Sequence, residues 1–483
     1  MTIEELQPQE VFHYFKEICQ IPRPSKKEAE ISAYLCRFAE KHGLDYKTDA
    51  AGNVLIRKNA SKGYENRPSI ILQSHMDMVC EKNSSVVHDF EKDAIETYVE
   101  DGWLKAKGTT LGADNGIGMA AQLAVLASDV IEHGALECLF TVDEETGLTG
   151  AFALQKGFLS GSTLINLDSE DDGEIFIGCA GGIDTTAVFT YTEQPSPKGF
   201  AAFSLKVSGL VGGHSGDDID KGRGNANKIL VRFLWSLMQK MEVKLAKIDG
   251  GNLRNAIPRE AEALFLAPVE KKEEVRIAMN HYINDIEEEL RITEPNVLLD
   301  LSSAELPTKC IDDTSTWKLL NALYACPHGV IRMSDDIKGL VGTSTNLASV
   351  KMLTDNKIIV GTSQRSSIES SKYDIANMVN SVFSLAGAEV KHGDGYPGWK
   401  PNPNSKIANA IADNYRQLFG EEPKIKAIHA GLECGLFSEK YPGMDMASIG
   451  PTMRGVHSPD ERLDIAATQK FWQLLLATLK NFE

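Results

Sequence analysis

Short, almost entirely apolar segments separated by helical patterns are the most restrictive feature of the first 180 residues of this chain. Four such segments lie at residues 53–57, 69–73, 136–142 and 163–167, and an alanine-rich helical pattern covers 116–127. Strands without a polar face must be covered on both sides, and strands that alternate with helices are typical of an α/β sheet. We therefore expect an α/β domain, with helices on both faces of a mixed sheet.

The pattern changes near residue 182. Residues 182–210 are rich in Thr, Val and Phe and contain a Ser-Pro-Lys-Gly turn, which predicts strands joined by a hairpin. Helical patterns follow at 225–239 and 271–290, and the helix and strand alternation returns near Pro401 and ends in a helix at 465–479. We expect a catalytic domain in two parts, 1–181 and 389–483, interrupted by an α+β domain at 182–388.

One helix start is predicted in detail. Ser25 and Glu28 have the spacing of a capping box, in which the serine caps the helix and the glutamate reaches back to it. Apolar residues follow at helical spacing, and Gly43 is expected to end the helix.

Charge and composition exclude several classes of protein. The chain has 50 Lys and Arg against 68 Asp and Glu, a formal charge of −18, which argues against nucleic acid and anionic membranes as partners. No apolar stretch is long enough to span a membrane, and the acidic start lacks the features of a secretory signal. The eight cysteines form no CxxC pair, so we expect reduced thiols and a cytoplasmic protein.

Acidic and imidazole side chains follow three of the predicted strands. They are His75 and Asp77, Glu144 and Glu145, and Asp168. The carboxyl ends of strands are where α/β sheets collect ligands and catalytic groups, so these side chains are expected to converge. Asp114 lies in GADNGIG, a glycine-rich turn before a helix, and can reach the same edge.

This combination of side chains suits a divalent metal ion. Imidazole and carboxylate together are typical ligands of Zn²⁺ and similar ions, and a carboxylate shared by two ions can hold them ~3.5–4 Å apart. Asp77 can accept the second ring N–H of His75, and Glu144 beside Glu145 offers a free base. Each motif alone also has an ordinary reading, such as a structural histidine, a helix cap or a solvated acidic pair. The glycine-rich turn lacks the Lys-Ser or Lys-Thr of a phosphate loop.

The motifs resemble a known family. The segments SHMDMV, GTTLGADNGIG, FTVDEETGLTGA and GPTMRGVHSPDE are similar to those of the zinc-dependent metallopeptidases that include carboxypeptidase G, aminoacylase and carnosinase. Within this family the resemblance is nearest to a bacterial dipeptidase that cleaves Xaa-His dipeptides. It covers nearly the whole chain, including the large insertion.

The resemblance implies a role for each residue of the motifs. Asp114 would bridge two metal ions, with His75 and Asp168 completing one ion, Glu145 and His457 completing the other, Asp77 orienting His75, and Glu144 acting as general base. The family often has a cis peptide bond after the bridging aspartate, here Asp114-Asn115. His457 owes its place in this set to the resemblance, because HSPDE alone reads as a turn before the last helix.

The resemblance also implies substrate-binding residues. His214, in VGGHSGDDI, would polarise the scissile carbonyl, and Arg365, after an apolar strand, would bind the substrate C-terminus through its guanidinium group. Asn255 and Gly431 are expected to contact substrate as well. Without the resemblance, His214 reads equally as part of a β-turn and Arg365 as a surface arginine.

These expectations combine into one functional hypothesis. The chain is predicted to hydrolyse dipeptides, of the Xaa-His type such as carnosine and with broad specificity, by means of two divalent ions, Zn²⁺ first and Co²⁺ or Mn²⁺ as alternatives. The insertion would act as a lid over the substrate. A deacylase of N-acyl amino acids with the same metal site and a non-enzymatic binding protein are the rival hypotheses. The sequence leaves open whether the chain forms a homodimer and whether the lid acts in cis or in trans.

Overall fold

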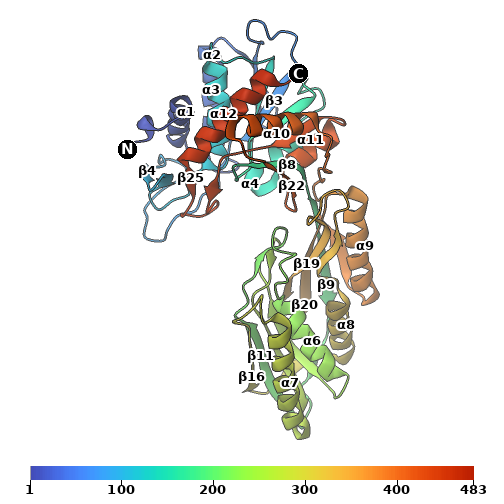
Figure 1. Ribbon diagram of the computed structural model, residues 1–483. Helices are drawn as coiled ribbons and strands as arrows, with labels where there is room; N and C mark the ends of the chain where they lie inside the picture. The colour runs from blue at the N-terminus through green and yellow to red at the C-terminus, as the bar shows by residue number, and fades with distance from the viewer. Residues whose placement is uncertain (1) are drawn as a thin grey trace. The chain divides into compact units, whose positions relative to one another are not determined.

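The computed structural model describes residues 2–483, which form two compact units (Figure 1). Unit 1 comprises the chain up to Cys179, Trp399–Ala427 and Leu432–Glu483. Unit 2 comprises Ala180–Gly398 and Ile428–Gly431. The sequence places the boundaries after residues 181 and 388. The second boundary lies later in the structure because β21 (Glu389–His392) pairs with β9 (Gly181–Thr190) in the sheet of unit 2.

An eight-stranded mixed sheet forms the centre of unit 1. Its order is β1 (Asp45–Thr48), β2 (Val54–Lys58), β6 (Leu136–Thr141), β3 (Ile70–His75), β7 (Thr163–Asn166), β23 (Asp445–Ser448), β8 (Glu174–Cys179) and β22 (Lys424–Ile428). Strands β6, β3, β7 and β23 run parallel to their neighbours in that group. Every residue of β3, β6 and β7 is buried, so both faces of the sheet are covered, which confirms the α/β prediction.

Helices and a small second sheet complete unit 1. The helices are α1 (Gln9–Cys19), α2 (Ala29–Lys41), α3 (Ala113–Ala127), α4 (Glu144–Gly147), α5 (Thr149–Ala153), α10 (Lys406–Phe419), α11 (Cys434–Lys440) and α12 (Ile465–Asn481), with a 3₁₀ turn η1 (Ile3–Glu5). The second sheet has the order β24 (Met453–Arg454), β25 (Arg462–Asp464), β5 (Trp103–Ala106) and β4 (Thr97–Glu100). Helix α3 packs on β3, and α10 packs on β23 and on α12.

The predicted capping box is wrong. Helix α2 begins at Ala29, Glu28 occupies the N-cap position, and no side chain caps the helix. The Ser25 hydroxyl instead donates to Oδ2 of Asp77 at 2.8 Å, and Oε1 of Glu28 accepts the backbone N–H of Asp143 at 3.0 Å. Both side chains therefore serve the loops at the end of the central sheet rather than their own helix.

A nine-stranded antiparallel sheet forms unit 2. Its order is β16 (Leu298–Ala304), β11 (Phe200–Ser208), β15 (Ala261–Pro268), β13 (Lys244–Gly250), β19 (Val341–Met352), β20 (Lys357–Ser366), β9 and β21, and β18 (Gly329–Met333) pairs with β19. The helices are α6 (Ala226–Met238), α7 (Lys272–Leu290), α8 (Asp313–Ala325) and α9 (Glu369–Leu385), with a 3₁₀ turn η2 (Val269–Lys271). Short pairs join β10 (Glu193–Pro195) to β17 (Lys309–Ile311) and β12 (Gly213–His214) to β14 (Ala256–Ile257).

Unit 2 contains the same strand and helix pattern twice. In one half β11, α6, β13, β15, α7 and β16 follow one another, and in the other half β9, α8, β19, β20, α9 and β21 do so. Each half is a βαββαβ motif in which the first strand lies between the third and the fourth. The first half is inserted between β9 and α8 of the second, and β13 and β19 pair where the halves meet.

This topology corrects the predicted hairpin in residues 182–210. The two strands exist, as β9 and β11, but they do not pair with each other. Strand β9 pairs with β20 and β21, whereas β11 pairs with β15 and β16, because each belongs to a different half. Among residues 2–483, no helix is long and apolar enough to cross a membrane.

Candidate metal centre

Asp114 lies between two groups of side chains in unit 1. Its Oδ1 is 3.0 Å from Nε2 of His75, which is also 3.3 Å from Oδ1 of Asp168. Its Oδ2 is 3.1 Å from Nε2 of His457, which is also 3.0 Å from Oε2 of Glu145. In both groups, the three ligand atoms lie within 4.8 Å of one another. The structure thus brings together all five residues expected to bind metal, with one oxygen of Asp114 facing each group.

The sheet of unit 1 delivers most of these side chains to one edge. His75 is the last residue of β3, Glu144 and Glu145 begin α4 after β6, and Asp168 follows β7 by two residues. Since β6, β3 and β7 are parallel neighbours, their carboxyl ends meet. His75, Glu144, Glu145 and Asp168 therefore converge at this edge, as predicted.

Asp114 and His457 lie in irregular backbone. Asp114 is in the first turn of α3 but has non-helical dihedral angles, with φ −80° and ψ 110°, and its bond to Asn115 is cis, as the resemblance implies. The Asn115 amide donates to Oδ1 of Asp168. His457 has φ 60° and lies in the turn between β24 and β25. A histidine in such a turn has no periodic pattern around it, so only the resemblance indicates His457.

Asp77 connects the histidine strand to the glutamate turn. Its Oδ1 lies 3.3 Å from Nδ1 of His75 and accepts the backbone N–H of Glu144 at 3.0 Å. Its Oδ2 accepts the N–H of Glu145 at 3.2 Å as well as the Ser25 hydroxyl. Although burial opposes the charged form, the hydrogen bond and charge of His75 hold the pKa of Asp77 at about 2. Asp77 is therefore ionised and faces the Nδ1 side of the His75 ring, the position that outer carboxylates take around metal-binding histidines.

The carboxyl groups of Glu144, Glu145 and Asp168 lie close to one another and to Asp114, and they are shielded from solvent. Burial raises the pKa of Glu144 well above its usual range, and burial also raises the pKa of Asp168. Burial and the charge of Asp114 raise the pKa of Glu145. Like charges at such short range disfavour ionisation unless a cation lies among them.

The residues present fit two divalent cations. Oε1 of Glu145 is buried without a hydrogen-bond partner in the described part of the chain, so one ligand oxygen is left for an ion. Imidazole nitrogen and carboxylate oxygen are a donor set that Zn²⁺, Mn²⁺ and Co²⁺ accept. The two groups offer three ligands each with Asp114 counted in both, and an ion held by either group would keep coordination positions for water or substrate.

Unit 2 holds Arg365, expected to bind the substrate carboxylate, and His214, expected to polarise the scissile carbonyl. Nη2 of Arg365 lies 3.5 Å from Nε2 of His214, and Nη1 of Arg365 donates to the Tyr396 hydroxyl at 3.0 Å. Arg365 is 7% exposed, and its Nε is buried without a hydrogen-bond partner within residues 2–483. Nδ1 of His214 accepts the backbone N–H of Asp217 at 3.2 Å. A buried guanidinium next to an imidazole is a suitable anion site.

Each half of unit 2 supplies one of these two residues. His214 ends β12, which lies between β11 and α6 of the inserted half, whereas Arg365 is in β20 of the other half. A single chain therefore brings both side chains together within unit 2.

Asn255 and Gly431 are also in unit 2. Asn255 is exposed, precedes β14, and its carbonyl accepts the N–H of Ser215 at 2.7 Å, next to His214. A Cβ atom at Gly431 would lie 2.8 Å from the ring of Tyr396, so that position requires glycine for the aromatic ring to pack. The structure gives Gly431 a packing reason that is independent of substrate.

Several residues of the site were not found from the sequence. Tyr396 contacts Arg365, and its carbonyl accepts from the buried Lys372 at 2.7 Å. Glu461 and Arg23 contact the backbone around the expected ligands. Glu461 is part of the quoted HSPDE motif, so the motif contained the signal, whereas Tyr396 and Arg23 have no local pattern that marks them.

The comparison with known proteins places the chain in a family. Residues 71–481 match peptidase family M20/M25/M40. This chain belongs to that family. The cytosol non-specific dipeptidase of Escherichia coli (strain K12) is 46% identical over 479 residues, which are 99% of this chain and 99% of that protein. The predicted resemblance to the zinc-dependent metallopeptidases is thereby confirmed.

Solved structures agree with this assignment. The crystal structure of aminoacylhistidine dipeptidase from Vibrio alginolyticus is 44% identical and has a TM-score of 0.92, covering 100% of this chain and 98% of that chain. The crystal structure of human carnosine dipeptidase 1 is 14% identical with a TM-score of 0.50, covering 98% of this chain and 95% of that chain, and shows the fold alone. The predicted fold class is confirmed by the first of these matches.

Proposed function

We propose that this protein is a metal-dependent dipeptidase of broad specificity that accepts Xaa-His substrates such as carnosine. The observation that carries the proposal is Asp114, whose two oxygens face two separate groups of metal-binding side chains. The names of the two full-length relatives, a cytosol non-specific dipeptidase and an aminoacylhistidine dipeptidase, support the substrate class. The first of these names and the reduced cysteines support a cytoplasmic location.

The metal centre would contain His75 and Asp168 on one ion, Glu145 and His457 on the other, and Asp114 on both. Two divalent ions, with Zn²⁺ our first choice and Co²⁺ or Mn²⁺ as alternatives, would activate a water molecule and polarise the scissile carbonyl. Asp77 keeps His75 in the tautomer whose Nε2 is free to bind.

Glu144 is assigned as the general base and acid. Its backbone N–H donates to Oδ1 of Asp77, which fixes its position beside Glu145. Its side chain belongs to neither metal-binding group. Its carboxylate would take a proton from the attacking water and give that proton to the leaving amine. Burial raises the pKa of Glu144 well above its usual range.

Unit 2 is assigned the recognition of the substrate. The buried guanidinium of Arg365 would bind the C-terminal carboxylate of the dipeptide in bidentate fashion. His214, whose Nε2 points toward Arg365, would donate to the carbonyl oxygen as negative charge develops on it. An anchor for the free carboxylate would place the scissile bond next to the C-terminal residue of the substrate, because the chain cannot continue past the anchor.

The test is a panel of dipeptides, dipeptide amides and N-acyl amino acids, assayed after removal of metal and addition of Zn²⁺, Mn²⁺ or Co²⁺. We expect no activity without metal, hydrolysis of several free dipeptides including Xaa-His after metal addition, and poor cleavage of amides. Faster hydrolysis of N-acyl amino acids than of any dipeptide would favour the deacylase, and full activity of the metal-free protein would overturn the proposal.

A further inference from the structure

Glu461 accepts hydrogen bonds from four consecutive backbone N–H groups. Oε2 accepts from Leu111 at 2.7 Å and Gly112 at 2.9 Å, and Oε1 accepts from Ala113 at 2.8 Å and Asp114 at 3.3 Å. Glu461 is 3% exposed. A carboxylate has about four acceptor positions, and here all of them are used. Glu461 therefore has no lone pair left for a metal ion or a proton transfer, and its contacts define the path of the turn that carries Asp114.

Arg23 holds the same turn from its carbonyl side. It is 2% exposed, its Nη2 donates to the carbonyl of Gly112, and its Nη1 donates to the carbonyls of Met76 and Asp77 at 3.0 and 2.7 Å. Gly112 has φ 68°, and a Cβ atom there would lie 2.5 Å from Nη2 of Arg23. The guanidinium thus joins the turn before Asp114 to the segment directly after His75.

Glu461 also shares a turn with His457. The two residues lie four positions apart, between β24 and β25, and the Nε2 atom of His457 is 3.1 Å from Oδ2 of Asp114. One short segment therefore places an imidazole opposite Asp114 and holds the backbone of Asp114 itself. Movement of this segment would change both positions together, which keeps their separation constant.

We propose that Glu461, opposed by Arg23, is a positioning residue that fixes Asp114 relative to His457 and His75 and thereby sets the affinity for both metal ions. This inference rests on the proposed metal centre. It assigns Glu461 no contact with metal or substrate, since its oxygens are occupied by backbone N–H groups. Its effect passes through the carboxylate of Asp114.

The experiment compares two buried glutamates in metal titrations of the purified protein against a chromophoric chelator. Glu461→Gln places an NH₂ group against backbone donors and releases the turn. Its matched control is Glu137→Gln, because Glu137 is 4% exposed and accepts the N–H groups of Ser160 and Gly161 at 2.8 and 3.0 Å but belongs to no metal-binding group. We expect Zn²⁺ affinity to fall ~10–100-fold in Glu461→Gln, the scale of losing an outer partner, and to stay unchanged in Glu137→Gln.

Two further measurements separate positioning from general destabilisation. The melting temperature of each metal-free variant reports its stability, and the electron paramagnetic resonance spectrum of the Mn²⁺-loaded protein reports whether the two ions are coupled. We expect the coupled signal in wild type and Glu137→Gln, and its weakening in Glu461→Gln. Arg23→Lys, which keeps the charge but loses the planar fork, should lower affinity in the same direction and carries the test if Glu461→Gln does not fold.

A Zn²⁺ affinity of Glu461→Gln equal to that of wild type would overturn the inference. If Glu461→Gln does not fold, the same result in Arg23→Lys would overturn it. Equal losses of affinity in Glu461→Gln and Glu137→Gln would do the same. Failure of the wild-type protein to bind two ions would instead overturn the proposed function, so the two failures are distinguishable.

Discussion

The backbone N–H of Glu144 donates to Oδ1 of Asp77 at 3.0 Å, and the next residue donates to the other oxygen of the same carboxylate. Asp77 also lies beside His75, so one buried charge contacts both the ring of His75 and the first two residues of α4. The side chains of the two neighbouring glutamates make different contacts. Oε2 of Glu145 lies 3.0 Å from Nε2 of His457, whereas the side chain of Glu144 belongs to neither metal-binding group. Their substitutions should therefore have separable effects.

Glu144→Gln should lower kcat by ~10² or more and leave two bound metal ions, because it removes the proton acceptor and no ligand. Glu145→Gln is the matched control and should lose metal, since Oε2 of Glu145 faces one of the two groups. Metal content by mass spectrometry, with kcat at saturating metal, checks both. Retained metal in Glu145→Gln together with lost metal in Glu144→Gln would reverse the two assignments.

Asp114→Ala should weaken the binding of both ions, because its two oxygens face the two groups separately. The loss should exceed the ~10–100-fold that an outer partner costs. His457→Ala is the comparison, since His457 belongs to only one group and should leave the other ion in place. One ion at full occupancy in Asp114→Ala, seen by anomalous scattering, would contradict the bridging role.

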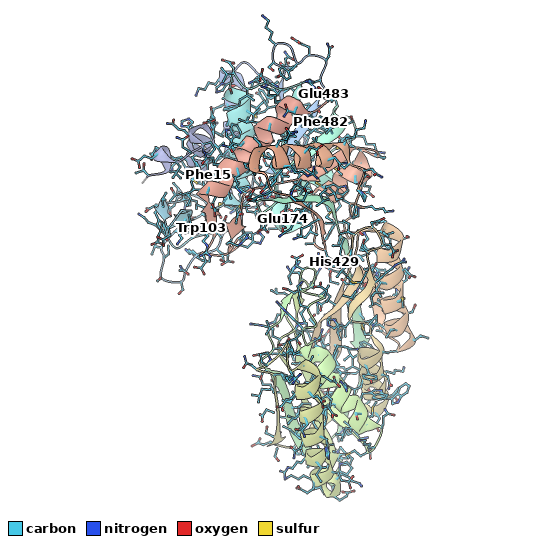
Figure 2. The ribbon with its side chains drawn as sticks, viewed as in Figure 1. Phe15, Trp103, Glu174, His429, Phe482 and Glu483 are labelled. Carbon is cyan, nitrogen blue, oxygen red and sulfur yellow. The ribbon has the colours of Figure 1, made fainter. Side chains whose placement is uncertain are left out.

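Acid should destabilise unit 2 through His429, which is labelled in Figure 2. Burial, with a contribution from the charge of Arg365, lowers the pKa of His429 from 6.5 to about 4, and its Nε2 is 2.7 Å from the Ser344 hydroxyl. The unfolded chain then binds a proton between these values and the folded chain does not, so stability is fully present above pH 6.5 and is lost as the pH falls toward 4. The loss at pH 5 is about 2 kcal/mol from this group.

Urea unfolding at pH 7 and pH 5 measures this loss. Glutamine is neutral at pH 7 and at pH 5. Between these two pH values the free energy of unfolding of His429→Gln should therefore fall by about 2 kcal/mol less than that of wild type. An identical decrease in both proteins would show that His429 does not carry the effect.

The centre of unit 1 could be predicted because β3, β6 and β7 are buried along their whole length and helical patterns separate them in the sequence. The predicted segments at 116–127 and 136–142 differ from α3 and β6 by only a few residues. The same reasoning located His75, Glu144, Glu145 and Asp168, since parallel strands must bring their carboxyl ends together.

The remaining features depend on contacts between distant segments. Ser25 has the local pattern of a helix cap, but it bonds to Asp77, which lies 52 residues away in the chain. The hairpin predicted in residues 182–210 failed because the strand partners of β9 come from beyond residue 340. Local pattern carries no information on such pairings, and the same holds for Arg23, whose partners are backbone groups of other loops.

The last prediction concerns the carboxylate anchor of unit 2. Arg365→Ala should mainly raise KM for dipeptides, because an anchor on the C-terminal carboxylate acts in both ground and transition states. The loss should be ~2–4 kcal/mol if the ion pair is desolvated. Tyr396→Phe, which removes the hydroxyl 3.0 Å from Nη1 of Arg365, should raise KM in the same direction by a smaller factor. His214→Ala should mainly lower kcat, since the charge it stabilises develops only during the reaction.

Dipeptide amides provide the decisive control for this anchor. Wild type should cleave them poorly, and Arg365→Ala should show a much smaller preference for the free acid, because the group that distinguishes the two substrates is gone. Metal content should stay unchanged in all three variants, since Arg365, Tyr396 and His214 belong to neither metal-binding group. Equal cleavage of amidated and free dipeptides by wild type would remove the anchor and point to an aminopeptidase, which reads the opposite end of its substrate.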